Sequence, residues 1–146
     1  DPDINLSRGM LAQILYNKEG NDDIVVNNNV FSDVAEDAWY AQAIAWAANK
    51  GIVSGYGNGL FGPEDAITRE QFASILWRYD GAKAAINNEL HFDDANEVSD
   101  YAQKAMCWAV ENGIINGYTL TTLNPKGQTT RAQAAQMLKN YYAPNE

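Results

Sequence analysis

The amino-acid sequence predicts an all-α protein built from tandem helix–loop–helix repeats. Residues 39–79 match residues 101–141 without a gap, and apolar residues in both segments recur at helical spacing. Outside the short run Ile24-Val25-Val26, no stretch shows the alternation of apolar and polar residues that is typical of a strand. The 146 residues are 46% hydrophobic and 20% charged, which is the composition of a folded globular protein.

The repeat is defined by identical residues that lie 62 positions apart. They are Ala43/Ala105, Trp46/Trp108, Ala47/Ala109, Gly51/Gly113, Ile52/Ile114, Gly55/Gly117, Tyr56/Tyr118, Pro63/Pro125, Thr68/Thr130, Arg69/Arg131, Gln71/Gln133, Ala73/Ala135, Leu76/Leu138 and Tyr79/Tyr141. Slightly out of this register, Phe31 and Asp33 match Phe92 and Asp94. Such self-similarity indicates stacked units that share a core.

A third copy is represented only by its last part. A shift of 61 places Pro2 on Pro63, Ser7 on Thr68 and Arg8 on Arg69. We therefore expect residues 1–18 to be the C-terminal part of a first repeat, followed by a second repeat at 31–80 and a third at 92–142. The polar stretches Glu19–Asn29 and Gly81–Glu89 are expected to be surface linkers.

Each full repeat begins with a predicted helix that is apolar on almost every side. In the second repeat this helix covers residues 39–50, and Gly51 is expected to end it, as Gly113 does in the third. The pattern places Trp46 and Trp108 in the core. It leaves two interpretations of Trp39 open, because this residue stands at the helix start beside polar residues and suits either the core or a sugar platform.

The second helix of each repeat carries its own start signal. Thr68 with Gln71, and Thr130 with Gln133, spell a capping box, whereas Ser7 is followed by Met10 and has only half of it. In residues 1–18 the apolar stripe consists of Leu11, Ile14 and Leu15, and the first helix of that repeat is missing from the sequence. We expect the stripe to be exposed and to cause association, either as a homodimer or with a fragment that supplies the missing helix.

Composition excludes several classes of function. A net charge of −9 disfavours nucleic-acid binding, and no apolar run approaches the ~18 residues that a membrane span requires. A single cysteine, Cys107, and a single histidine, His91, rule out an internal disulfide, a Cys- or His-based metal cluster and a His-based catalytic relay. The sequence therefore predicts a non-enzymatic protein without cofactor or metal.

Three arginines follow the helix caps directly and provide a chemical clue. Arg8, Arg69 and Arg131 would each face the positive end of a helix dipole, which is unfavourable by about 0.3–1 kcal/mol. An anion held by free helix N–H groups together with the guanidinium would compensate for this. An ion pair with Glu64, Asp65 or Asp94 would also compensate, and the spacing leaves both interpretations open.

The ordered motifs resemble the surface-layer homology (SLH) repeat of bacterial cell-envelope proteins. They are Phe31-x-Asp33, Trp39-Tyr40, Trp46-Ala47, Gly51-Ile52, Gly55-Tyr56, Phe61-x-Pro63 and Ile67-Thr68-Arg69. The resemblance implies a pseudo-threefold spindle around a three-helix bundle, with grooves between repeats. It implies an extracellular module on the bacterial cell surface that anchors proteins by binding an anionic secondary cell-wall polysaccharide, often one that carries a pyruvate ketal.

The resemblance also implies which residues line the grooves. They are Arg8, Arg69, Arg131, Asp33, Asp94, Trp39, Gly55, Tyr56, Gly117 and Tyr118. The third repeat departs from the pattern, because Tyr101 replaces the tryptophan and Thr119 and Thr121 replace Gly57 and Gly59. This departure keeps an alternative open, namely a protein–protein interaction or self-assembly module that retains the fold without sugar binding.

Overall fold

The computed structural model describes residues 1–19 and 30–144, which fall into two compact units. Unit 1 consists of Asp1–Leu6 and Ile67–Glu146, and unit 2 consists of Ser7–Ala66. The predicted linker Glu19–Asn29 lies, apart from its first residue, outside the described residues.

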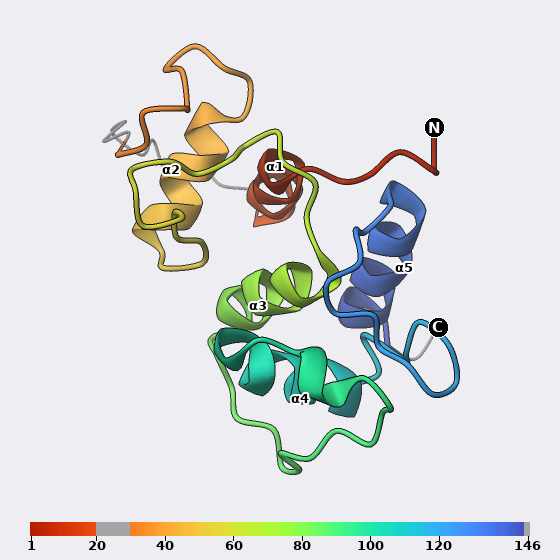
Figure 1. The fold of residues 1–146 in the computed structure, drawn as a ribbon. Helices are drawn as coiled ribbons and strands as arrows, with labels where there is room; N and C mark the ends of the chain where they lie inside the picture. Colours follow the sequence, from red (N-terminus) through yellow and green to blue (C-terminus); the bar gives the residue numbers. More distant parts are fainter. Residues whose placement is uncertain (20–29, 145–146) are drawn as a thin grey trace. The chain divides into compact units, whose positions relative to one another are not determined.

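The described residues form five α-helices and two short 3-10 helices (Figure 1). Unit 2 contains α1 (Arg8–Glu19) and α2 (Ala41–Asn49). Unit 1 contains α3 (Arg69–Tyr79), η1 (Ala95–Glu97), η2 (Asp100–Ala102), α4 (Gln103–Glu111) and α5 (Arg131–Tyr142). Extended pairing within the described ranges is limited to isolated bridges, so the predicted all-α class is confirmed.

Side-chain caps fix the starts of α1, α3 and α5. Both predicted capping boxes are present, at Thr68 with Gln71 and at Thr130 with Gln133. Ser7 supplies half of such a box, because its Oγ accepts the N–H of Met10 at 3.1 Å. The helix predicted over residues 39–50 is shorter by two residues at its start, and Tyr40 occupies the N-cap position without a side-chain hydrogen bond.

In unit 2, α1 packs against α2, and this corrects one expectation. Leu11 and Leu15 are fully buried, and the ring of Tyr16 lies edge-on to Trp46 with centroids 5.5 Å apart. The prediction of a bare stripe on residues 1–18 was wrong, because the second helix of one repeat packs against the first helix of the following repeat. The reason for expecting a homodimer or an added fragment disappears with it.

In unit 1, α3 and α4 repeat this pairing (Figure 1). Phe72 and Leu76 of α3 and Met106 of α4 are completely buried. The predicted core position of Trp108 is confirmed at 4% exposure, and the neighbouring Cys107 is also buried, at 5%. An apolar first helix and an amphipathic second helix thus bury their faces against each other across the repeat boundary.

A closed ring of three backbone hydrogen bonds lies within unit 1. The N–H of Leu6 donates to Thr129 O at 2.8 Å, the N–H of Thr129 to Ile67 O at 2.9 Å, and the N–H of Ile67 to Leu6 O at 2.9 Å. These three residues occupy the same position in the three copies of the repeat. The ring is threefold in its bonding, and the complete threefold spindle stays a prediction.

Candidate functional site

An aspartate in each full repeat holds the loop before the second helix. Asp33 accepts the N–H groups of Phe61 and Gly62 at 2.9 and 2.8 Å. Asp94 accepts those of Leu123 and Asn124, both at 2.8 Å. Two backbone donors on one carboxylate fix the position of the loop, because hydrogen bonds to a charged group are strong.

The arginine at each helix start holds the same loop residue from its other side. Arg8 Nε donates to Phe61 O at 2.9 Å, and its Nη2 donates to Ser54 O at 3.1 Å. Arg69 Nε donates to Leu123 O at 2.8 Å. Phe61 in unit 2 and Leu123 in unit 1 are therefore each held by an aspartate through the N–H and by an arginine through the carbonyl.

The tyrosine of the Gly-Tyr loop lies against the guanidinium. Arg8 Cζ is 4.9 Å from the ring centroid of Tyr56 and 4.5 Å from that of Phe61, and Arg69 Cζ is 5.5 Å from that of Tyr118. Arg8 and Arg69 are only 6% and 5% exposed, whereas Tyr56 and Tyr118 are 47% and 55% exposed. Each site thus presents an accessible aromatic ring beside a largely buried cation.

The glycines before these tyrosines are required by close packing and by backbone conformation. A Cβ at Gly55 would lie 2.7 Å from Leu60 O and 2.6 Å from the Phe31 ring. Gly117 has a φ of +108°, which side chains other than hydrogen strongly disfavour. Both glycines shape the loop that carries the tyrosine.

The N–H groups at the helix starts near the arginines already form hydrogen bonds within the chain. This corrects the expectation that free helix N–H groups would help to hold an anion. The N–H groups of Arg69 and Glu70 donate to Gly127 O and Pro125 O, both at 2.9 Å. The corresponding groups of α1 donate to Asp65 O and Pro63 O, and those of α5 to Ile4 O and Pro2 O. The expectation of free helix N–H groups was wrong, because the loop before each cap folds back over the helix end.

Arg69 also does not form the ion pair that the alternative interpretation required. Among residues 1–19 and 30–144 its guanidinium makes one hydrogen bond, to Leu123 O, and no ion pair. Both carboxylate oxygens of Asp94 are engaged by backbone N–H groups, although its charge lies near Arg69. Burial lowers the pKa of Arg69, and Tyr118 and Asp94 partly offset this effect.

Arg69 lines a cavity of about 530 Å³ in unit 1. We call it the Arg69 cavity. Its lining consists of Arg69, Ile114, Ile115, Asn116, Gly117, Tyr118, Gln133, Gln136, Met137 and Asn140. Four of these side chains are amides, so the cavity combines a cation, an aromatic ring and several neutral hydrogen-bonding groups.

Two further predicted site residues, Trp39 and Arg131, are exposed near helix starts. Trp39 is 60% exposed just before α2, and its ring packs edge-on against Tyr40 with centroids 4.9 Å apart. Arg131 is exposed at the start of α5.

Sequence reasoning missed a buried acid next to Arg69. Glu70 is 2% exposed, and it accepts the N–H of Ser99 at 3.0 Å and the Nζ of Lys126 at 3.2 Å. Burial raises the pKa of Glu70, but these hydrogen bonds outweigh the effect and hold the pKa below its ordinary value. The repeat gave no signal for it, because Gly9 and Ala132 stand at the equivalent positions.

Fold and site together define a helical repeat protein with loop-built, arginine-centred sites. A family model described as the S-layer homology domain matches residues 30–73 and 91–135. These two segments make up more than half of the chain, which therefore belongs to the S-layer homology domain family. The resemblance stated from the sequence motifs is confirmed.

Several curated proteins are similar to the chain over most of its length. An exoglucanase XynX of Acetivibrio thermocellus is 38% identical over 76% of the chain, and a surface-layer 125 kDa protein of Lysinibacillus sphaericus is 37% identical over 72%. A cellulosome-anchoring protein of Acetivibrio thermocellus is 28% identical over 94%. The chain spans only 10%, 9% and 32% of these proteins' own lengths, respectively.

The family and these relatives indicate an extracellular location in the cell envelope and an anchoring type of module. The S-layer homology domain is a non-catalytic module, and the exoglucanase matches over only a small part of its length. None of the described helices is both long and apolar enough to cross a membrane.

Proposed function

We propose that the chain anchors a protein to the bacterial cell surface by binding an anionic, pyruvylated secondary cell-wall polysaccharide. The supporting observation is Arg69, a largely buried guanidinium with one internal hydrogen bond that lines a cavity rich in amides. In this proposal residues 1–18, 31–80 and 92–142 are the three repeats, and the ligand lies in the grooves that they form.

The chemistry of the Arg69 cavity suits an acidic sugar. The two Nη groups of Arg69 can donate in parallel to the carboxylate of a pyruvate ketal. The amides of Asn116, Gln133 and Gln136 offer donors and acceptors for sugar hydroxyls, and the exposed ring of Tyr118 offers a flat apolar surface. In this proposal Arg69 recognises the charge of the ligand carboxylate, and the amides and the Tyr118 ring recognise the shape and the hydroxyl groups of the sugar.

The other predicted site residues take indirect or parallel roles in this proposal. Asp94 and Gly117 position the loop that meets Arg69, and Asp33 and Gly55 do the same for Arg8 in unit 2. Arg8 and Tyr56 form a second site of the same type. Trp39 and Arg131, which are both exposed, are proposed as outer contacts for the polymer.

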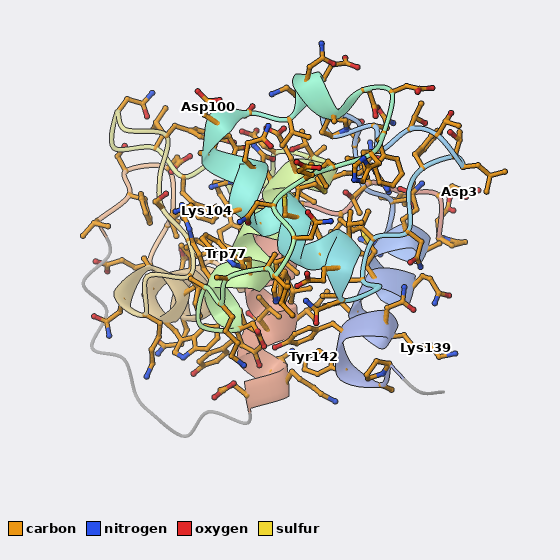
Figure 2. All side chains as sticks on the ribbon, turned by 90° about the horizontal axis from the view of Figure 1, so that it is seen from below. Asp3, Trp77, Asp100, Lys104, Lys139 and Tyr142 are labelled. Atoms are coloured by element: carbon orange, nitrogen blue, oxygen red, sulfur yellow. The ribbon has the colours of Figure 1, made fainter. Side chains whose placement is uncertain are left out.

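Binding to purified polysaccharide tests the proposal through Arg69. Arg69→Ala removes a charge-assisted contact worth about 1.5–3 kcal/mol, so the affinity should fall by about 10- to 100-fold. Lys139→Ala is the matched control, since it removes a cation whose side chain points away from α5 into solvent (Figure 2). Circular dichroism of each variant separates lost binding from lost folding.

Removal of the pyruvate from the polymer tests the same contact without altering the protein. We expect the depyruvylated polymer to bind Arg69→Ala and the unmodified protein equally weakly. Equal affinity of the unmodified protein for both polymers would contradict a carboxylate-centred site and would favour stacking on Tyr118 and Tyr56. No binding of either polymer would favour the interaction module without sugar binding.

A further inference from the structure

A second cavity, of about 410 Å³, lies in unit 1 next to the Arg69 cavity. We call it the distal cavity. Ile114 and Asn140 line both cavities, so the two cavities are neighbours. Its further lining includes Asp80, Lys83, Trp108, Glu111, Asn112 and Tyr141. The Arg69 cavity reaches the start of α3, whereas the distal cavity lies at the ends of α3, α4 and α5.

Aromatic rings and polar groups line the distal cavity side by side. The ring of Tyr141 packs against Trp108 and Tyr79, with centroids 6.1 and 6.2 Å apart. The Tyr141 hydroxyl donates to Asp80 Oδ1 at 2.7 Å, and Asn112 Nδ2 donates to Trp108 O at 2.9 Å. Trp108 is buried, so the half-buried ring of Tyr141 is the aromatic surface that a ligand can reach, with fixed hydroxyl, carboxylate and amide groups beside it. An apolar ring with a few fixed polar groups suits the binding of a sugar ring.

The linker between the second and third repeats forms one wall of this cavity and is held in place. Trp77 Nε1 donates to Lys83 O at 2.8 Å. The Glu111 carboxylate accepts the N–H groups of Ile86 and Asn87, both at 2.9 Å to Oε1. Because these hydrogen bonds join parts of the chain itself, they hold the linker in place, and ligand binding need not order it.

The charge of the distal cavity differs from that of the Arg69 cavity. Asp80 and Glu111 are acidic, and Lys83 lies 3.6 Å from Asp80 as an ion pair, so one negative charge is left uncompensated. A second carboxylate of the ligand would be repelled here. Neutral hydroxyl groups, in contrast, can donate to Asp80 and to the amide oxygens.

We propose that the distal cavity is a subsite for the neutral sugar residues that adjoin the acidic residue at Arg69. The inference rests on the proposed function, because it assigns the acidic residue of the same polymer to the Arg69 cavity. The chain would then recognise two features of the polymer. A carboxylate would bind at the start of α3, and a neutral stretch would bind at the ends of α3 and α5.

A steric block tests the subsite. Ala84 lines the distal cavity and is exposed, so Ala84→Trp fills the space without removing a hydrogen bond. Ala135→Trp is the matched control, since Ala135 is exposed on α5 and lines neither cavity. The probes are a pyruvylated fragment of one repeating unit and a fragment of three units, measured by calorimetry.

The unmodified protein and Ala135→Trp should bind the longer fragment about tenfold more tightly than the shorter one. Ala84→Trp should lose this gain and bind the short fragment as the unmodified protein does. Equal gains in Ala84→Trp and Ala135→Trp would overturn the subsite and leave the Arg69 site intact. Failure of the unmodified protein to bind either fragment would overturn the proposed function as well.

Discussion

Phe61 and Leu123 are the loop residues to which both the aspartate and the arginine of each site bind. An aspartate binds the N–H of each, and an arginine binds the carbonyl. The arginine could be identified from the sequence as unusual, because a cation at a helix start needs compensation. The partner of the arginine could not be identified from the sequence, because it is a backbone carbonyl, and every residue type has one.

Asp94→Asn should lower both stability and ligand binding. An amide keeps one acceptor oxygen where the carboxylate has two, so the hydrogen bond from Leu123 or from Asn124 weakens. We expect a loss of about 1.5–3 kcal/mol in the free energy of unfolding, measured by urea denaturation. Asp93→Asn, a change at the exposed neighbouring residue, is the control and should have little effect.

Thr129→Val should stabilise the protein. Thr129 is fully buried, and its Oγ1 has no hydrogen-bond partner within the described part of the chain. The equivalent positions hold Leu6 and Ile67, which shows that an apolar side chain suits the site. Valine has the same shape without the hydroxyl, so we expect a gain of about 1 kcal/mol in thermal unfolding. A lower melting temperature would mean that the hydroxyl is satisfied in solution.

Each core is formed by a pair of helices from consecutive repeats, α1 with α2 in unit 2 and α3 with α4 in unit 1. The sequence identified the helices, the capping boxes and the core tryptophans, because each depends on residues close together in the chain. It did not identify which helix covers which, so the stripe of α1 was wrongly expected to be bare. The periodicity of Leu11 and Leu15 marks a face to be buried but does not specify the partner.

The caps differ in strength between the repeats, and the difference is measurable. Thr68→Ala removes the hydroxyl half of a complete box and should cost about 0.5–2 kcal/mol. Ser7→Ala removes the single hydrogen bond to Met10 and should cost less. Chemical denaturation of the two variants gives the comparison, and a larger loss for Ser7→Ala would contradict it.

The stability of the whole molecule should depend on pH through acids held in the charged form. Hydrogen bonds place the pKa of Glu70 below its ordinary value of 4.5, and Asp94 is lowered from 3.8 by the N–H groups of Leu123 and Asn124 despite partial burial. An acid whose pKa is lower when folded stabilises the protein above its unfolded pKa. Stability should therefore be constant at neutral pH and fall below about pH 4.5.

Glu70→Gln isolates one part of this dependence. The amide cannot titrate, so the free energy of unfolding should change less between pH 6 and pH 3 than in the unmodified protein. Denaturant midpoints across that range provide the measurement. Identical slopes for both proteins would assign the acid sensitivity to other carboxylates.

The charge of the chain should also affect how it meets an acidic polymer. The net charge of −9 repels an anionic ligand at long range, although Arg69 attracts its carboxylate at short range. Salt screens the long-range term first, so the association rate constant should rise as ionic strength increases from about 0.01 to 0.1 M. Stopped-flow or surface-based kinetics would reveal this, and a steep decrease would indicate long-range attraction instead.

The ring of Leu6, Ile67 and Thr129 has a consequence for how the chain folds. Its members lie about sixty residues apart, so the ring cannot close until residue 129 has been synthesised and brought to residue 6. Contacts of such long sequence separation slow folding, because the entropy of closing large loops is lost before the bonds form. Local helices can therefore form early, but the ring in unit 1 closes only after residues 6, 67 and 129 have come together.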